Sequence, residues 1–259
     1  MKHLFVGDIH GDVEVVRNVL RFADGRHVVF LGDFLDSFRF GKKDQIESLL
    51  AAMKAARSGK ATLITANHEV SYLDVEQRCA GWNAVMDSLV LPHQHQLRSV
   101  MKPFLLLRDP AGSRRPLLVT HAGVTSQLWS ACGLTVERLE EALTEASRDS
   151  RSWFYSTGRA RGGLRPFGGP LWCDWNHEFT PVSEITQVVG HTGDVGVPYG
   201  FRQKLLSGIR CTAKNFDFNV DCLQSTSEIL EYDHDAGFAV VCRVDAEGIH
   251  HMSSPVFLK

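Results

Sequence analysis

The sequence predicts an α/β fold built on a parallel sheet with helices on its faces. Three observations support this prediction. Apolar runs of strand length alternate with segments of helical periodicity, five polar motifs each follow an apolar run, and 44% of the 259 residues are hydrophobic. That hydrophobic fraction allows a sizeable core and argues against global disorder.

The first part of the chain alternates strands with helices. Residues 3–6, 27–31 and 61–65 are short apolar runs that predict buried strands. Between them, apolar side chains recur at helical spacing and predict helices over residues 13–22 and 43–57. This β-α-β-α-β order is typical of a parallel sheet.

The middle of the chain is less regular. Residues 69–96 begin with a helical pattern and become irregular. Apolar residues 104–107 and 117–120 predict two strands, which the turn-rich segment 109–115 joins into a hairpin.

The second half predicts one helix, one long loop and several short strands. An amphipathic pattern covers residues 136–146, and residues 150–169 form a loop rich in arginine and glycine. Residues 186–189 predict a further strand. Turn residues then separate three strands of an expected antiparallel meander, at 216–220, 229–232 and 238–244. Because the chain has no internal repeat, low-complexity tract or linker, we expect one domain over residues 1–259.

Charge, apolar length and cysteine spacing exclude several classes of function. With 28 basic and 30 acidic residues, the chain has no basic excess that predicts nucleic-acid binding. No run reaches the ~20 apolar residues of a membrane span, and the first apolar run is too short for a signal peptide. The six cysteines form no C-x-x-C pair. We therefore expect free thiols and a cytoplasmic location.

Five polar motifs carry the oxygen and imidazole donors of the sequence. The carboxyl ends of parallel strands share one edge of a sheet, where ligands gather, and the first three motifs follow the first three predicted strands. The five motifs are Asp8-Ile9-His10, Gly32-Asp33-Phe34-Leu35-Asp36, Asn67-His68-Glu69, Thr120-His121-Ala122-Gly123 and Gly190-His191-Thr192.

Each motif taken alone has a simpler structural interpretation. Asp8 is then a turn residue, and Asp33 and Asn67 cap helices. His121 and His191 are then satisfied structural histidines. The joint occurrence of five motifs in one order, each at a strand end, favours a shared site instead.

Taken together, the motifs resemble those of the calcineurin-like metallophosphoesterase superfamily. The closest resemblance is to its phosphoprotein phosphatase branch, which includes bacterial-type Ser/Thr phosphatases and diadenosine tetraphosphate hydrolases. The matching segments span residues 7–192, and Phe218-Asn219-Val220-Asp221 is more weakly similar to a later strand of that branch.

The resemblance implies a four-layer α-β-β-α sandwich, in which two packed mixed sheets are flanked by helices. It also implies a dinuclear centre, with Asp33 as the ligand shared by both metals. His68 would act as the general acid, oriented by Asp36. The implied metal ligands are Asp8, His10, Asp33, Asn67, His121 and His191.

The chemistry of the donors agrees with this assignment. Oxygen and imidazole donors without thiolates suit manganese, which we expect, with iron or zinc as alternatives. Two divalent cations lower the pKa of a bridging water, so that hydroxide is present near neutral pH to attack phosphorus. A histidinium held by a carboxylate can then protonate the leaving group.

Three departures from the family pattern affect these expectations. Ala66 stands where the family has glycine, which would cost stability if the position needs a positive φ. Ala122 follows His121, as in bacterial-type members. Ser37 replaces an arginine that holds the substrate phosphate. Because guanidinium groups match phosphate oxygens, we expect a replacement contact from one of four arginines, namely Arg39, Arg159, Arg161 and Arg165.

The sequence thus predicts a metal-dependent phosphatase that hydrolyses phosphate monoesters, with phosphoserine or phosphothreonine as candidate substrates. The alternative is a pyrophosphohydrolase that cuts dinucleoside polyphosphates of the diadenosine tetraphosphate type. A third hypothesis, a binding scaffold with a decayed site, is disfavoured because every implied ligand is present. The expected partner is a phosphoprotein, a small phosphoester or a nucleotide, and the sequence specifies neither the substrate nor the oligomeric state.

Overall fold

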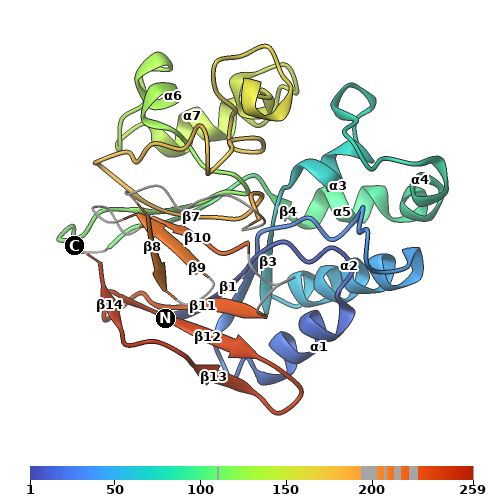
Figure 1. The fold of residues 1–259 in the computed structure, drawn as a ribbon, viewed down its shortest axis with the longest axis horizontal. Coiled ribbons are helices and arrows are strands. Elements are labelled where there is room, and N and C mark those ends of the chain that lie inside the picture. Colours follow the sequence, from blue (N-terminus) through green and yellow to red (C-terminus); the bar gives the residue numbers. More distant parts are fainter. Residues whose placement is uncertain (110, 194–202, 207–208, 213–216, 222–226, 259) are drawn as a thin grey trace.

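Two β-sheets pack face to face in the computed structural model, and helices cover their outer faces (Figure 1). The structure describes residues 1–109, 111–193, 209–212, 217–221 and 227–258, and the backbone of residues 203–206. The predicted fold class, a four-layer α/β sandwich, is confirmed.

The first sheet contains the strands that open the chain. Its order is β13-β12-β11-β1-β2-β3-β4, with β14 paired to β12. Strands β1 to β3 are mutually parallel, as predicted, and β4, which was not predicted, joins β3 in parallel. Strands β11 to β13 extend the sheet antiparallel from β1. The strands are β1 (Lys2–Val6), β2 (His27–Phe30), β3 (Ala61–Ile64), β4 (Met101–Lys102), β11 (Glu228–Asp233), β12 (Phe238–Val244), β13 (Ile249–His251) and β14 (Val256–Phe257).

The second sheet has the order β5-β6-β7-β10-β9-β8. The predicted hairpin is present, because β5 and β6 pair antiparallel. Strand β7 then joins β6 and β10 in parallel. The strands are β5 (Leu105–Leu107), β6 (Leu117–Val119), β7 (Thr186–Val189), β8 (Gln203–Leu206), β9 (Ile209–Thr212) and β10 (Phe218–Asn219).

Helices cover both outer faces (Figure 1). None in the described part of the chain is both long and apolar enough to cross a bilayer. The α-helices are α1 (Val13–Phe22), α2 (Lys42–Arg57), α3 (Asn67–Ser71), α4 (Ala84–Val90), α5 (Gln94–Val100), α6 (Ser126–Ala131) and α7 (Leu139–Ala146).

Three apolar clusters match the three interfaces between the four layers. One lies between the first sheet and helices α1 and α2, with Val16 and Leu49 among its members. The central cluster joins Phe5 of β1 to Val119 of β6, so it lies between the sheets. The third places Leu143 of α7 against Leu118 of β6. Successive residues of a strand point to opposite faces, so Leu118 and Val119 serve different clusters.

Three element predictions were wrong in detail. The segment 69–96, predicted to become irregular after a helical start, contains helix α4 and the start of helix α5. The helix predicted over residues 136–146 begins at Leu139, because Thr135 Oγ1 accepts a hydrogen bond from Arg138 N (3.4 Å) in a preceding turn. The predicted strand at 216–220 shortens to β10 and lies in the second sheet rather than in a meander with β11. Residue 216 itself lies outside the described part of the chain.

Candidate metal centre

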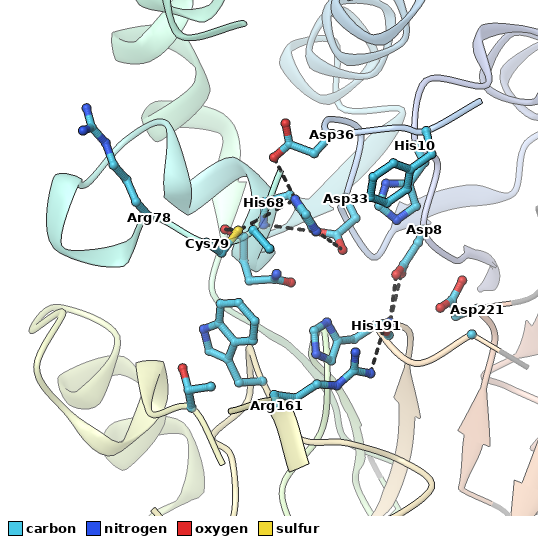
Figure 2. Close-up of a pocket in the computed structure, with 16 residues that line it drawn as sticks. Asp8, His10, Asp33, Asp36, His68, Arg78, Cys79, Arg161, His191 and Asp221 are labelled. Carbon is cyan, nitrogen blue, oxygen red and sulfur yellow. Dashed lines mark hydrogen bonds and ion pairs between the residues drawn. The ribbon is translucent and has the colours of Figure 1, made fainter. Parts of the chain in front are cut away.

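A cavity of about 800 Å³ lies where the carboxyl ends of the parallel strands of both sheets meet (Figure 2). Cavities of this size hold small-molecule ligands in proteins. Buried His121 lies behind Asn67, which lines the cavity. The other predicted site residues in its wall are Asp8, His10, Asp33, Asp36, His68, His191 and Arg161.

The backbone of the site is strained. Positive φ angles are rare for residues other than glycine, and the structure assigns them to four site residues. The φ angles are 42° at His10, 49° at Asp33, 58° at Asp36 and 67° at His191. Strained residues of this kind persist where surrounding structure holds them, and they concentrate at functional sites.

Asp33 lies at the middle of the donor set. It belongs to two groups of ligand atoms that lie within 4.8 Å of one another: Asp8, His10 and Asp33 form one, and Asp33, His121 and His191 form the other. In two-metal catalytic sites the ions usually lie ~3.5–4 Å apart. At that distance one ligand has to be shared between them. The position of Asp33 therefore suits a bridging carboxylate.

Backbone carbonyls fix the tautomers of two histidines. His10 Nδ1 donates to Leu35 O at 2.9 Å, and His121 Nδ1 donates to Leu31 O at 2.8 Å. A carbonyl oxygen only accepts, so in each neutral ring the proton is on Nδ1 and Nε2 carries a lone pair. This arrangement is typical of histidines that bind metal ions.

Oxygen and nitrogen atoms that can bind a metal ion converge around His121 Nε2. Asn67 Oδ1 lies 2.7 Å from this nitrogen, His191 Nδ1 lies 3.1 Å from it, and Asp33 Oδ2 lies 3.4 Å from it. Ligands of a metal bound at ~2.1 Å are separated by about 3 Å. A divalent cation therefore suits this cluster of donors, and His191 Nε2 is left buried without a hydrogen-bond partner.

The electrostatics also favour cations here. Burial, with Asp221 and Asp33 nearby, raises the pKa of Asp8 well above its usual value. Burial, with His121 and Arg161 nearby, lowers the pKa of His191 well below its usual value, so this ring is a neutral donor. Divalent cations would offset the mutual repulsion of these carboxylates.

His68 and Asp36 form a separate pair beside the donor set. His68 Nδ1 lies 2.8 Å from Asp36 Oδ2, and Tyr72 donates to Asp36 Oδ1. His68 Nε2 is 4.0 Å from Asp33 Oδ2. Although burial opposes protonation, Asp33 and Asp36 raise the pKa of His68 well above its usual value. A histidine held by a carboxylate in this way can act as a general acid when it is protonated.

Glu69 has a supporting role that sequence reasoning missed. Its carboxylate accepts from Asp33 N and from Phe34 N, both at 2.8 Å. Burial raises its pKa to about 7. Glu69 follows His68 in the third motif and ties α3 to the loop after β2. Its place within the motif was the only sequence signal for this contact.

Of the four arginines expected near the substrate, Arg161 lines the cavity and the other three are absent from its wall as described. Arg161 Nη2 donates to Thr192 Oγ1 at 3.0 Å, and Arg161 Nε forms an ion pair with Asp174 at 2.9 Å. Of the other three, Arg39 stacks its guanidinium on the ring of Phe40. Arg159 and Arg165 are joined by a backbone hydrogen bond from Arg159 N to Arg165 O.

The cavity wall also contains residues to which the sequence assigned no role. Asp221, in the weakly matching later segment, is buried near Asp8 (Figure 2). Phe38 and Arg78 line the cavity as well. Neither belongs to a motif, so no sequence signal pointed to them.

Ala66 does not strain the chain. Its φ is −124° and its ψ is 161°, an extended conformation open to any residue. Alanine therefore pays no conformational cost at this position. The glycine requirement lies instead at Gly32, where φ is 99° and an added Cβ would be 2.2 Å from Ala66 Cβ.

Comparison with known proteins identifies a family and similar solved structures. A family model described as calcineurin-like phosphoesterase matches residues 1–220. A metallophosphoesterase structure from Sphaerobacter thermophilus is 13% identical, with a TM-score of 0.41, over 98% of this chain and 89% of that one. The TT1561 structure from Thermus thermophilus is 14% identical, with a TM-score of 0.37, over 93% of this chain and 97% of that one. A search of curated proteins found no match.

Proposed function

Because the chain belongs to the calcineurin-like phosphoesterase family, a family of metal-dependent hydrolases with dinuclear sites, we propose that it hydrolyses phosphate monoesters. The observation that carries this proposal is the position of Asp33 between two groups of metal donors, next to the His68–Asp36 pair. We assign the protein to the phosphoprotein phosphatase branch, with phosphoserine and phosphothreonine as candidate substrates.

In this proposal, Asp8 and His10 would hold the first cation, Asn67, His121 and His191 would hold the second, and Asp33 would be shared between them. The oxygen and nitrogen donors favour manganese, with iron or zinc as alternatives. When bound, the two cations supply an acidified water as nucleophile and neutralise charge on the phosphoryl oxygens.

The remaining residues act on the substrate. His68 donates a proton to the leaving oxygen, and Asp36 keeps its ring oriented through the 2.8 Å hydrogen bond. Arg161, held by Asp174 and Thr192 beside His191, takes the place of the phosphate contact missing at Ser37. Its fixed position lowers the entropy lost when the phosphate binds.

We also propose that residues 1–259 form one domain in a reducing, cytoplasmic environment. Strands β11 and β12 extend the first sheet from β1, which ties the end of the chain to its beginning. Five cysteines in the described residues are free thiols, which supports a reducing environment.

Removal and return of metal tests the proposal. Protein stripped by a chelator is assayed with p-nitrophenyl phosphate and a phosphoserine peptide, before and after adding manganese, iron or zinc. We expect activity only with metal. Equal turnover without metal would contradict the dinuclear mechanism, and no turnover under any condition would favour the scaffold hypothesis.

The His68→Ala variant tests the general acid. General acids contribute roughly 10²–10⁴-fold to rate, and their loss matters most for poor leaving groups. We expect about a hundredfold fall in kcat for the phosphoserine peptide and a much smaller fall for p-nitrophenyl phosphate. The exposed His95→Ala variant is the control. Equal losses on both substrates would remove His68 from the role of acid.

A second candidate function is hydrolysis of dinucleoside polyphosphates. It uses the same metal centre and differs in the leaving group, which is then a nucleotide. Phe38 and Arg78 favour this candidate, because they add to the cavity wall an aromatic ring and a cation that has no acidic partner among the described residues.

A further inference from the structure

We propose that Asp36, His68 and Cys79 form a third metal site, which binds zinc and inhibits hydrolysis. The three side chains line the cavity, and one ligand atom from each lies within 4.8 Å of the others (Figure 2). None of them belongs to the two donor groups that share Asp33. Binding at this site is independent of the proposed function, whereas inhibition rests on the proposed role of His68 as general acid.

A thiol distinguishes this group from the candidate dinuclear centre. The donors around Asp33 are carboxylate oxygens and imidazole nitrogens, which accommodate manganese. Cys79 adds a sulfur, and a thiolate with an imidazole and a carboxylate forms a ligand set that is typical of zinc. Manganese binds such a set more weakly than zinc does. The third site should therefore select zinc from a mixture of the two metals.

The distances suit a tetrahedral zinc ion with one open position. Zinc binds sulfur at ~2.3 Å and nitrogen at ~2.0–2.1 Å, so tetrahedral ligands of these two types lie about 3.6 Å apart. Cys79 Sγ lies 3.8 Å from His68 Nδ1. Asp36 Oδ2 lies 2.8 Å from the same nitrogen, and these two atoms need to separate by roughly 0.5 Å when a metal replaces the proton between them. Because all three residues line the cavity, water can occupy the fourth position.

The fold holds the three donors in place. Tyr72 donates to Asp36 Oδ1, which leaves Oδ2 for the other two donors. Cys79 N donates to Ser71 Oγ at 3.0 Å, and this bond ties the backbone of Cys79 to helix α3. The loop after Cys79 packs on Asp36, since a Cβ added at Gly81 would lie 2.8 Å from Asp36 Cβ. Donors that are held in place lose little entropy when they bind a metal.

A second group in the structure also combines a thiol with other donors. It consists of Glu231, Cys242 and His251. Its carboxylate already binds two cations, because Arg26 Nη1 lies 2.6 Å from Glu231 and Lys2 Nζ lies 3.2 Å from it. A zinc ion there would lie against two positive charges. Asp36 forms no ion pair with a lysine or arginine in the described part of the chain, so its group is the better zinc site.

A zinc-bound His68 no longer serves as the general acid. The Cys79 thiol and His68 Nδ1 release their protons to solvent when they bind the metal. The ring then keeps one proton, on Nε2, which lies 4.0 Å from Asp33 Oδ2 on the side of the dinuclear centre. A neutral imidazole is a much weaker acid than histidinium, so it protonates the leaving oxygen poorly. Zinc at this site therefore slows turnover without displacing the cations around Asp33.

Cobalt binding tests the site without an activity measurement. Cobalt bound by a thiolate absorbs in the near ultraviolet, and the donors around Asp33 include no sulfur. We expect manganese-loaded protein to show this band, with saturation at one cobalt per chain and loss on addition of zinc. Cys79→Ser should abolish the band, whereas Cys132→Ser, at another partly exposed cysteine, should retain it.

His68→Ala should weaken cobalt binding at least about tenfold, because even changes next to a metal ligand cost 10–100-fold in affinity. Circular dichroism checks that each variant is folded, and Cys79→Ala replaces the serine variant if that one does not fold.

Zinc inhibition measures the consequence. Hydrolysis of a phosphoserine peptide by manganese-loaded protein is followed against zinc concentration, and each variant is compared with its own rate without zinc. We expect Cys79→Ser to raise the half-inhibitory zinc concentration about tenfold or more, and Cys132→Ser to leave it unchanged. Hydrolysis of p-nitrophenyl phosphate, whose leaving group needs little protonation, should be inhibited much less.

A wild-type protein without the cobalt band, or a band that survives Cys79→Ser, would overturn the site. A band lost in Cys242→Ser instead would place thiolate binding in the other group. Equal zinc inhibition of wild-type protein and Cys79→Ser would overturn the inhibitory role, because zinc then acts at the dinuclear centre. Failure of the proposed function is distinguishable, because the cobalt band would then appear in a protein that hydrolyses neither substrate with any metal.

Discussion

At the scale of single residues, the site depends on backbone conformations that most residues avoid. His10, Asp33, Asp36 and His191 all have positive φ angles. The left-handed region costs an L-residue ~1–2 kcal/mol. Gly32, just before Asp33, has a φ of 99° and lies against Ala66, the residue before Asn67. The close contact between Gly32 and Ala66 determines the distance between the second and third motifs.

A double-mutant cycle tests that contact. Gly32→Ala should lower the free energy of unfolding by more than about 2 kcal/mol, since the new Cβ meets Ala66 Cβ and φ is unfavourable. Ala66→Gly alone should cost only about 0.5–1 kcal/mol, from greater chain entropy. The double variant should lose at least about 1 kcal/mol less than the sum of the single losses. Urea denaturation measures all three, and strict additivity would show that the two positions do not touch.

Residue types in the site could be predicted from the sequence, but their contacts could not. Carboxylates and histidines at strand ends predicted a shared edge, and the structure brings all six proposed ligands together. Arg161 was one of four equivalent candidates, because an arginine in a loop gives no sign of its direction. Arg78 and Phe38 gave no signal, since their meaning depends on a cavity that only the fold creates.

At the scale of elements, strand β1 leads into the site residue Asp8 and contains a buried histidine, His3, near its start. His3 is 3% exposed and stacks on Phe5, with ring centres 6.0 Å apart. His27 of β2 meets it edge-on at 5.9 Å. Burial, helped by the nearby charges of His27 and His234, lowers the pKa of His3 to about 4. The folded protein therefore holds this ring neutral.

This shift predicts loss of stability in acid. The unfolded ring has a pKa of about 6.5, so the unfolded state binds the proton first as pH falls. The contribution of His3 is complete above about pH 6.5 and decreases until the pH reaches the folded pKa of about 4. The full loss is about 3 kcal/mol by the relation of 1.36 kcal/mol per pKa unit.

The His3→Phe variant, which keeps an aromatic ring but cannot titrate, should flatten that slope. Urea unfolding between pH 7 and pH 4 measures it in both proteins. Identical slopes would show that His3 is not the group responsible.

Periodicity predicted the regular elements well and the short ones poorly. Helix α1 and strands β7 and β12 have the predicted boundaries. Strands β8 and β9 were not predicted, because residues 203–212 mix charged and apolar side chains without clear alternation. Strand β10 has two residues, and its parallel partner β7 comes from a distant part of the sequence. Its pairing is therefore a tertiary effect that local pattern does not contain.

At the scale of the whole molecule, the candidate centre joins the two sheets. Asp8, Asp33 and Asn67 follow strands of the first sheet, whereas His121 and His191 follow β6 and β7 of the second. His191 N already donates to Asp8 Oδ1 across this junction at 3.0 Å. The packed sandwich was predicted only through resemblance to the family, because periodicity shows which face of a strand is apolar but not which sheet covers it.

Anomalous X-ray scattering from crystals grown with manganese tests the central claim most directly. The account predicts two manganese peaks, one beside Asp8 and His10 and the other beside Asn67, His121 and His191, with the Asp33 carboxylate between them. The same crystals of Asp33→Asn should lose at least one peak. Folded wild-type protein without a manganese ion at Asp33, with the donor side chains in place, would contradict the account.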